Sequence, residues 1–301
     1  MISYTKEGAK KNALVFILFI APAFILFTLF VVTPVFQGAY YSLFNWKGAG
    51  PLDKEKFLGL DNFIKLFHDK YFLTAISNNI KIVIYSLCFQ LPVAFIFALL
   101  IGRKSFTGSI LFRSLYFFPY VLTEIIGGVI WKFIYNPQFG LLTQFSKFFT
   151  DAKNEIALLG NPDTAFGAIF LVIFWKYIGF HMILYIAGLQ GVPRELEDAA
   201  VIDGANGMQV IWNVILPSMR NVITISVFLS VIGSFNVFDI VWAMGQGGPV
   251  HSTETLVTYL YNFGYKRFAF GYGSAVAIVI FFVCLVFNLL YQKFIVGDKD
   301  K

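Results

Sequence analysis

Apolar residues along this chain gather in six long runs, and polar residues gather in the segments between them. Each run holds about 20 residues, the length that an α-helix needs to cross a hydrocarbon core about 30 Å thick. The six runs are Leu14–Phe36, Ile80–Ile101, Ser114–Tyr135, Phe166–Ala187, Val222–Met244 and Ser274–Ile295. They are continuous rather than alternating, and only helices or closed barrels satisfy backbone polar groups in lipid. The pattern therefore predicts an all-α protein with six transmembrane helices, forming a single transmembrane domain over residues 1–301.

The basic residues outside these runs predict which side of the membrane each segment faces. Short loops rich in Lys and Arg tend to stay in the cytoplasm. The basic residues that precede the first run, follow the second, flank the loop after the fourth and end the chain are Lys6, Lys10, Lys11, Arg103, Lys104, Arg113, Arg194, Arg220, Lys293, Lys299 and Lys301. An even number of spans places both ends on one side, so we expect both termini in the cytoplasm.

Composition supports a membrane protein and argues against nucleic acid as a partner. Hydrophobic residues make up 58% of the chain and charged residues only 13%, whereas soluble domains average about 45–50% and about 25%. The formal net charge is +6, but the basic residues lie in segments where membrane orientation explains them. We therefore expect a lipid bilayer, and no nucleic acid, around this chain.

The sequence contains no motif for a catalytic, nucleotide-binding or metal-binding site. The segment Gly102–Ser105 is too short to be a phosphate-binding loop, and no other stretch fits that pattern. The two cysteines, Cys88 and Cys284, fall inside apolar runs, where reduced thiols are ordinary. We therefore predict a chain that binds no cofactor or metal, catalyses no reaction, and relies on a separate subunit for any use of ATP and Mg.

The loop after the fourth run, at about residues 190–217, carries a predicted short helix. Pro193 suits the first turn of a helix, where its missing N–H costs nothing. Three acidic residues follow within that turn, where the helix dipole favours anions: Glu195, Glu197 and Asp198. Gly204 or Gly207 ends the helix. Residues at helical spacing form a face of mostly small side chains that a partner could approach closely: Leu196, Ala199, Ala200 and Asp203.

This loop resembles the conserved cytoplasmic loop of permeases from binding-protein-dependent ABC importers. The family pattern is Glu-Ala-Ala, three residues, Gly, nine residues, Ile, any residue and Leu-Pro. The matching positions are Asp198-Ala199-Ala200, Gly204, Val214, Leu216 and Pro217. Asp198 replaces the family's Glu, and Val214 replaces its Ile. Further stretches typical of the carbohydrate-uptake branch are Asp203-Gly204-Ala205, Phe235–Asp239, Gly247-Gly248-Pro249 and Ser252–Leu256.

The resemblance implies a function and a set of partners. In that family the loop is a coupling helix that docks into a cleft of the ATPase. Here the coupling residues would be Glu195, Glu197, Asp198, Ala199, Ala200, Asp203 and Gly204. The implied partners are a second related permease, two ATP-binding cassette subunits and an external solute-binding protein. The expected function is import of a sugar, in particular an oligosaccharide, by alternating access across a bacterial or archaeal plasma membrane.

Ionisable residues inside the apolar runs are candidates for the substrate pathway. A charge at the bilayer centre costs about 2.5–3.5 kcal/mol on insertion scales, so we expect each such residue to have a structural or functional role. Glu124 and Lys176 both fall near the middle of antiparallel runs. They form either an ion pair that stabilises packing or part of a polar cavity that binds sugar hydroxyls, and we favour the cavity.

Similarity to the permeases of maltose transporters extends this set. It places Tyr120, Glu124, Gly179, Ser230 and Ser234 where those permeases line their sugar site, and Val237 at a position that is polar there. The full set expected along the pathway is Tyr120, Glu124, Lys176, Gly179, Ser230, Ser234, Asn236 and Asp239.

Two other classes of function remain as alternatives at this point. A secondary transporter driven by an ion gradient would use the carboxylates of Glu124 and Asp239 as ion sites. A membrane enzyme would need clustered His, Cys or acidic residues, and the sequence shows no such cluster. The sequence also leaves the solute open, since glycerol phosphate or another polyol is compatible with the same family.

Overall fold

The computed structural model describes residues 18–102, 108–149 and 157–293. The first residues of the first predicted run and the last of the sixth lie outside this part of the chain. So do several of the basic residues used for orientation: Lys6, Lys10, Lys11, Arg103, Lys104, Lys299 and Lys301. The described residues form helices and loops, and their only strand-like pairing is one isolated bridge between Phe44 and Phe57.

The chain forms two compact units. The first contains residues up to Leu66 together with Asn262–Phe281, and the second contains Phe67–Tyr261 together with the residues after Phe281. Within the described residues, four helices are long and apolar enough to cross a membrane: Leu18–Tyr41, Lys70–Gly102, Pro162–Gln190 and Phe270–Tyr291. Two further pairs of helices meet the same test when each bent pair is counted as one span. The described residues are therefore mostly helical, and they contain four to six helices that could cross a membrane.

The first unit is built around the exposed helix at the N-terminal side. The segment Leu18–Tyr41 includes η1 (Thr28–Val32) and α2 (Thr33–Tyr41), and none of its apolar window is buried within this chain. Asn62, at the start of α3 (Asp61–His68), donates its amide to the carbonyls of Ser42 and Phe44 at 2.7 and 3.1 Å. The other elements that begin in this part of the chain are η2 (Lys54–Lys56) and α16 (Phe270–Tyr291).

The second unit is centred on α9 (Pro162–Gln190). A long helical segment packs against it, made of α4 (Lys70–Tyr85), η3 (Ser86–Gln90) and α5 (Leu91–Gly102). The contact between α5 and α9 contains fully buried side chains that exclude water and lipid from the seam: Ala94, Ala98, Met182 and Leu189.

The third predicted run is not one straight helix. α6 (Ser109–Val121) and α7 (Glu124–Ile134) meet at an angle of 100°. Pro119 lies in the last turn of α6, and the next residues turn extended, so Thr123 caps α7 by accepting the N–H of Ile126 at 3.4 Å. The hydrophobic pattern missed this break because the run stays apolar on both sides of it.

The fifth predicted run is likewise divided. α13 (Arg220–Phe235) ends at Asn236, and a separate helix follows, α14 (Asp239–Gly245), which packs against α7. Before α13, the chain forms α11 (Gly207–Val210), η4 (Ile211–Ile215) and α12 (Leu216–Ser218) and then turns by 74°. After α14 come α15 (Leu256–Tyr259) and η5 (Leu260–Tyr265), while α8 (Leu141–Phe149) follows α7.

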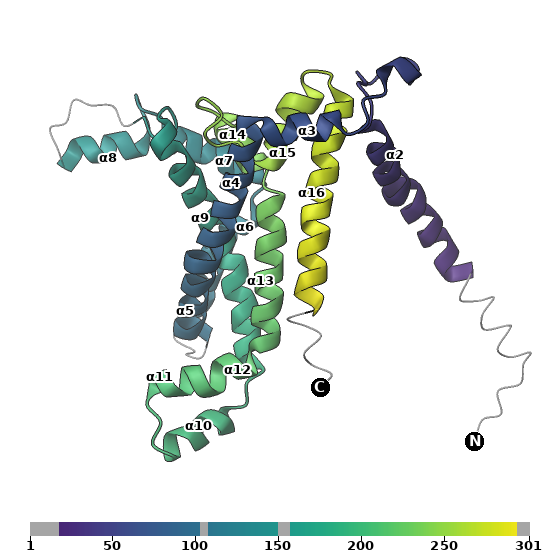
Figure 1. Ribbon diagram of the computed structural model, residues 1–301. Helices are drawn as coiled ribbons and strands as arrows, with labels where there is room; N and C mark the ends of the chain where they lie inside the picture. The colour runs from purple at the N-terminus through teal and green to yellow at the C-terminus, as the bar shows by residue number, and fades with distance from the viewer. Residues whose placement is uncertain (1–17, 103–107, 150–156, 294–301) are drawn as a thin grey trace, which may run out of the picture. The chain divides into compact units, whose positions relative to one another are not determined.

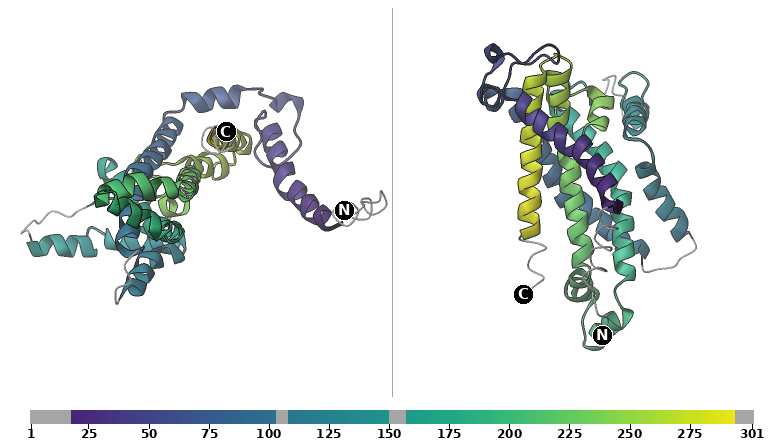
Figure 2. Two further views of the ribbon diagram at one scale, coloured as in Figure 1. Left: turned by 90° about the horizontal axis from the view of Figure 1, so that it is seen from below. Right: turned by 90° about the vertical axis from the view of Figure 1, so that its right-hand side faces the viewer.

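The loop after α9 forms α10 (Arg194–Ile202), as its sequence predicts. The helix ends at Gly204, whose φ of +87° suits a residue without a side chain. The N–H of Gly204 reaches the carbonyl of Val201 at 3.0 Å, and that of Ala205 reaches Ala200 at 2.9 Å. This pair of bonds is a Schellman motif. In Figures 1 and 2, α10 and α11 lie at one end of the second unit, and α7 and α14 lie at the other.

Candidate functional site

A polar cavity of about 210 Å³ lies within the second unit, between η3, α6, α9 and α13. Its volume is well above the roughly 10–15 Å³ that one water needs. The residues that line it are Ile82, Ser86, Gln90, Tyr120, Ile173, Tyr177, Phe180, His181, Leu229, Ser230, Gly233, Ser234 and Val237. A cavity with hydroxyl, amide and aromatic groups in the middle of apolar helices is the candidate solute site.

α13 carries three serines spaced by one helical turn, Ser226, Ser230 and Ser234, of which the last two line the cavity. Ser226 contacts His181 of α9, with 2.8 Å between its hydroxyl and Nδ1. Ser234 donates to the carbonyl of Ser230 at 2.7 Å. The hydroxyl of Ser230 is buried and has no hydrogen-bond partner in the described protein. A buried hydroxyl without a partner is costly, so a bound solute or water at this point would stabilise it.

Aromatic rings of α6 and α9 also line the cavity. The rings of Tyr120 and Phe180 stack with centroids 4.7 Å apart and an interplanar angle of 21°. Tyr177 approaches Tyr120 edge-on, with ring centroids 6.1 Å apart. Aromatic faces of this kind can pack against the apolar C–H faces of a ligand ring.

Lys176 caps the broken end of α6 instead of pairing with Glu124. The amine lies 2.6 Å from the carbonyl oxygen of Leu122 and 3.3 and 3.4 Å from those of Pro119 and Tyr120. These carbonyls end a helix, where the dipole favours a cation. Glu124, the first residue of α7, instead accepts the hydroxyl of Tyr177. Within the described residues the two side chains form no direct salt bridge, and the choice between an ion pair and a polar cavity stays a prediction.

The predicted pathway residues fall into three groups. Tyr120, Ser230 and Ser234 line the cavity, whereas Glu124 and Lys176 adjoin it through the contacts just described. The others do not line it: Gly179, Asn236 and Asp239.

The three residues outside the lining have other surroundings. Gly179 is buried where α9 meets α6, and a Cβ there would overlap the carbonyl oxygen of Tyr116. Asn236 is exposed and donates to the carbonyl of Ile232 at 2.9 Å. Asp239 begins α14 and is half-buried.

Sequence reasoning missed four polar residues of the lining: Ser86, Gln90, Tyr177 and His181. Ser86 and Gln90 stand one turn apart inside an otherwise apolar run, which was a usable signal. Tyr177 and His181 are likewise four residues apart on α9. Each pair therefore presents one polar stripe, and that spacing could have identified the cavity-facing sides of both helices.

The predicted coupling residues lie on or just after α10. Glu195, Asp198, Ala199, Asp203 and Gly204 are exposed, whereas Glu197 and Ala200 are half-buried. Ala200 packs inward against the apolar core of the second unit, so the outward small residue is Ala199. Apolar side chains are also exposed on this helix, at 49% for Leu196, 60% for Val201 and 85% for Ile202.

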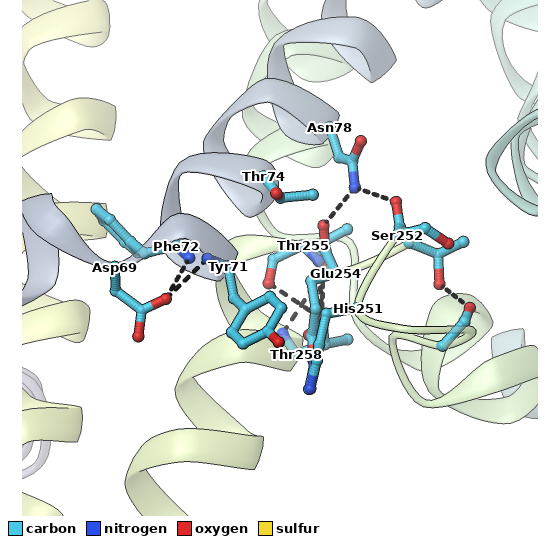
Figure 3. A network of polar contacts seen from close by, with 12 residues as sticks. Asp69, Tyr71, Phe72, Thr74, Asn78, His251, Ser252, Glu254, Thr255 and Thr258 are labelled. Atoms are coloured by element: carbon cyan, nitrogen blue, oxygen red, sulfur yellow. Dashed lines mark hydrogen bonds and ion pairs between the residues drawn. The ribbon is translucent and has the colours of Figure 1, made fainter. Parts of the chain in front are cut away.

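A polar network at the other end of the second unit holds the loop before α15 (Figure 3). Glu254 is fully buried, and its carboxylate accepts the hydroxyl of Thr258 at 2.6 Å and lies 2.9 Å from Nδ1 of His251. Asn78 of α4 donates to the carbonyls of Ser252 and Glu254 at 2.8 and 2.9 Å. Hydrogen bonds from the Asn78 side chain therefore hold the loop against α4.

A second asparagine of α4 connects this network to the cavity wall. Asn79 donates to the carbonyl of Ser234 at 2.6 Å and accepts the N–H of Leu256 at 2.8 Å. One amide thus joins the last turn of α13 to the first turn of α15.

Comparison with known proteins identifies the family of this chain. Residues 79–295 match the family described as binding-protein-dependent transport system inner membrane component. The chain belongs to this family. It is therefore a membrane permease subunit of an ABC importer, and ATP hydrolysis is carried out by a separate subunit. The match confirms the family that the loop pattern of residues 198–217 indicated.

Individual relatives cover nearly the whole permease. It is 32% identical to the probable ABC transporter permease protein YurN of Bacillus subtilis, over 97% of this chain and 99% of that protein. It is 34% identical to the diacetylchitobiose uptake system permease protein NgcF of Streptomyces coelicolor, over 91% and 80%. A bacterial ABC transporter that imports the acidic polysaccharide alginate has a chain of the same fold, with a TM-score of 0.81, 21% identity, and 96% and 98% coverage.

Proposed function

We propose that this permease imports a sugar, in particular an oligosaccharide, through the cavity between η3, α6, α9 and α13. The observation that carries the proposal is the lining itself, in which hydroxyl and amide groups of Ser86, Gln90 and Ser230 face the stacked rings of Tyr120 and Phe180. Sugars need both kinds of contact, because their hydroxyls form hydrogen bonds and their ring faces are apolar. The name of NgcF, a permease for diacetylchitobiose uptake, supports the same class of solute.

Transport of this solute requires coupling to ATP, and we assign that role to α10. Its first turn is acidic, and Ala199, Val201 and Ile202 are exposed although they are apolar. An apolar surface on a short helix beyond the membrane helices is suited to a protein partner. The Schellman end at Gly204 fixes how the chain leaves the helix, so a push on α10 is passed on to α11 and α13.

The proposed topology has six spans with both termini in the cytoplasm. Each bent pair counts as one span, and α10 then lies on the same side as the termini, in keeping with the basic residues Arg194 and Arg220 beside it. The complete importer contains a second related permease, two ATP-binding cassette subunits and an external solute-binding protein. ATP binding switches the pathway between two packings, one open to each side.

A transporter driven by an ion gradient is the second candidate, and it would use the carboxylates of Glu124 and Asp239, both of which lie near the lining residue Tyr177. Glu124 is engaged by Tyr177, which favours a structural role for its carboxylate. Uptake into proteoliposomes by the assembled complex separates the two. We expect sugar uptake to require ATP and to survive an uncoupler, and loss of uptake with the uncoupler would favour the ion gradient.

The coupling role of α10 has its own test in Ala199→Arg. Ala199 is exposed, so the larger side chain leaves the permease folded but overpacks a partner, at a typical cost of about 1–3 kcal/mol. We expect the variant to insert normally, to lose the ATPase on co-purification and to lose transport. Ala157→Arg is the control, since Ala157 is exposed in the loop before α9. Equal retention of the ATPase in both variants would contradict the assignment.

A further inference from the structure

We propose that the cavity accepts uncharged polyhydroxylated solutes and rejects anionic ones, and that Gln90 with Ser86 forms its specificity-determining wall. The proposal rests on the proposed function and narrows it. Proteins similar to this chain are named for both kinds, since NgcF serves the uptake of diacetylchitobiose and the chain of similar fold belongs to a transporter of an acidic polysaccharide. The charge of the lining decides between them.

The wall formed by η3 is polar in the middle of a membrane helix. Ser86 and Gln90 are each 98% buried and line the cavity. The hydroxyl of Ser86 donates to Oε1 of Gln90 at 3.4 Å, a long bond. The amide nitrogen of Gln90 makes no hydrogen bond to another described residue, although an amide offers two donors. An amide buried among apolar helices is costly unless a ligand or water occupies those donors.

The lining residues of α13 include a matching group. The hydroxyl of Ser230 has no partner within the described protein and is 93% buried in the same cavity. A hydroxyl both donates and accepts. Gln90 and Ser230 therefore present free hydrogen-bonding capacity from two helices to one space, which suits a solute with several hydroxyls.

The charges around the cavity disfavour an anion. None of the thirteen lining residues is Lys, Arg, Asp or Glu. The amine of Lys176 is held by three backbone carbonyls of α6 and caps that helix. The carboxylate of Glu124 adjoins the cavity as Lys176 does, and it accepts the hydroxyl of the lining residue Tyr177. A carboxylate or phosphate of the solute would lose its hydration without gaining a free cation, because the amine of Lys176 is already held by carbonyls, and it would meet the like charge of Glu124.

Direct binding tests the charge selectivity without selection by the solute-binding protein. The assembled transporter in nanodiscs is mixed with neutral gluco-, xylo- and N-acetylglucosamine oligosaccharides, uronic acid oligosaccharides and glycerol 3-phosphate, and saturation-transfer NMR detects which ones bind. We expect signals from neutral sugars only. Equal or stronger signals from the uronates or the phosphate would overturn the selectivity. ATP-driven uptake of the same solutes into proteoliposomes tests the proposed function separately, because uptake of anions alone would refute the selectivity and leave the transport function standing.

The wall assignment is tested by Gln90→Glu, which keeps the shape of the side chain and replaces the two N–H donors by a negative charge. We expect the KM for uptake of the bound sugar to rise about tenfold, the factor that one hydrogen bond commonly accounts for, with a smaller change in kcat. Gln144→Glu is the matched control, since Gln144 is exposed on α8 and far from this lining in sequence. Equal KM values for both variants would overturn the role of Gln90. The amount of assembled complex after gel filtration shows whether either variant folds poorly.

Discussion

The two ends of the second unit differ in which side chains they bury and which they expose. At one end, the loop before α15 buries its charged group: Glu254 is fully enclosed and bonded to Thr258 and His251, and Asn78 secures the backbone. At the other end, α10 exposes an apolar residue as large as Ile202 at 85%. The loop bonds its buried carboxylate within the chain, whereas α10 leaves large apolar side chains exposed.

This difference separates buried residues that stabilise the fold from exposed residues of α10, for which we propose contact with a partner. A buried charge that loses its partner destabilises the protein, so substitutions at the Glu254 end should act on stability. An exposed side chain contributes little to stability, so substitutions on α10 should act on assembly and transport.

The largest expected effect is the difference in accessibility from the two sides of the membrane. Val250 is 78% exposed in the loop before α15, and Ile202 is 85% exposed on α10. In a Cys88→Ala, Cys284→Ala background, an impermeant thiol reagent added outside should label Val250→Cys and spare Ile202→Cys. Adding the ATPase to inverted vesicles should then protect Ile202→Cys. Labelling of both sites from outside would refute the topology and the comparison built on it.

An intermediate effect is expected from removing one carboxylate at each end. Glu254→Gln leaves Thr258 or His251 facing an amide in a fully buried site, so we expect a loss of about 1–3 kcal/mol of stability. Glu195→Gln changes an exposed residue of α10 and should leave stability unchanged. The apparent melting temperature of the purified complex is the measurement. Equal melting temperatures would mean that Glu254 is not an anchor of the loop.

The smallest expected effect concerns the end of α10. Gly204 has a φ of +87°, which an alanine adopts only at a cost of about 1–2 kcal/mol, whereas Gly207 begins α11 with a Cβ position in open space. Gly204→Ala should therefore reduce the ratio of sugar transported to ATP hydrolysed, and Gly207→Ala should not. The ratio is measured in proteoliposomes. Reduced coupling in both variants would indicate that the whole loop, rather than the turn at Gly204, sets the efficiency.

The sequence predicted features that depend on local chemistry. Pro193, the acidic first turn and Gly204 were enough to predict α10 and its end, because each of these signals acts within one turn of helix. Apolar length was enough to predict most membrane helices. Tyr120, Ser230 and Ser234 were placed in the solute site by resemblance, and the cavity contains all three.

The sequence failed where the partner of a side chain is the backbone or lies on another helix. Lys176 seemed to need a carboxylate, but its partners are the carbonyls released where α6 ends at Val121, and hydropathy does not reveal that break. Gln90 was not selected as a candidate because hydropathy is averaged over a window of residues. The apolar neighbours on both sides outweigh its single amide in that average. Its role became visible only when η3 was placed beside α9 and α13.

The contact at Gly179 has a consequence for how the importer can move. A Cβ there would overlap the carbonyl oxygen of Tyr116, so α9 and α6 touch backbone to backbone at this point. We expect such a close contact to resist sliding of the two helices past each other. The α6 and α9 sides of the cavity should then keep their spacing during transport, while α13 moves relative to them.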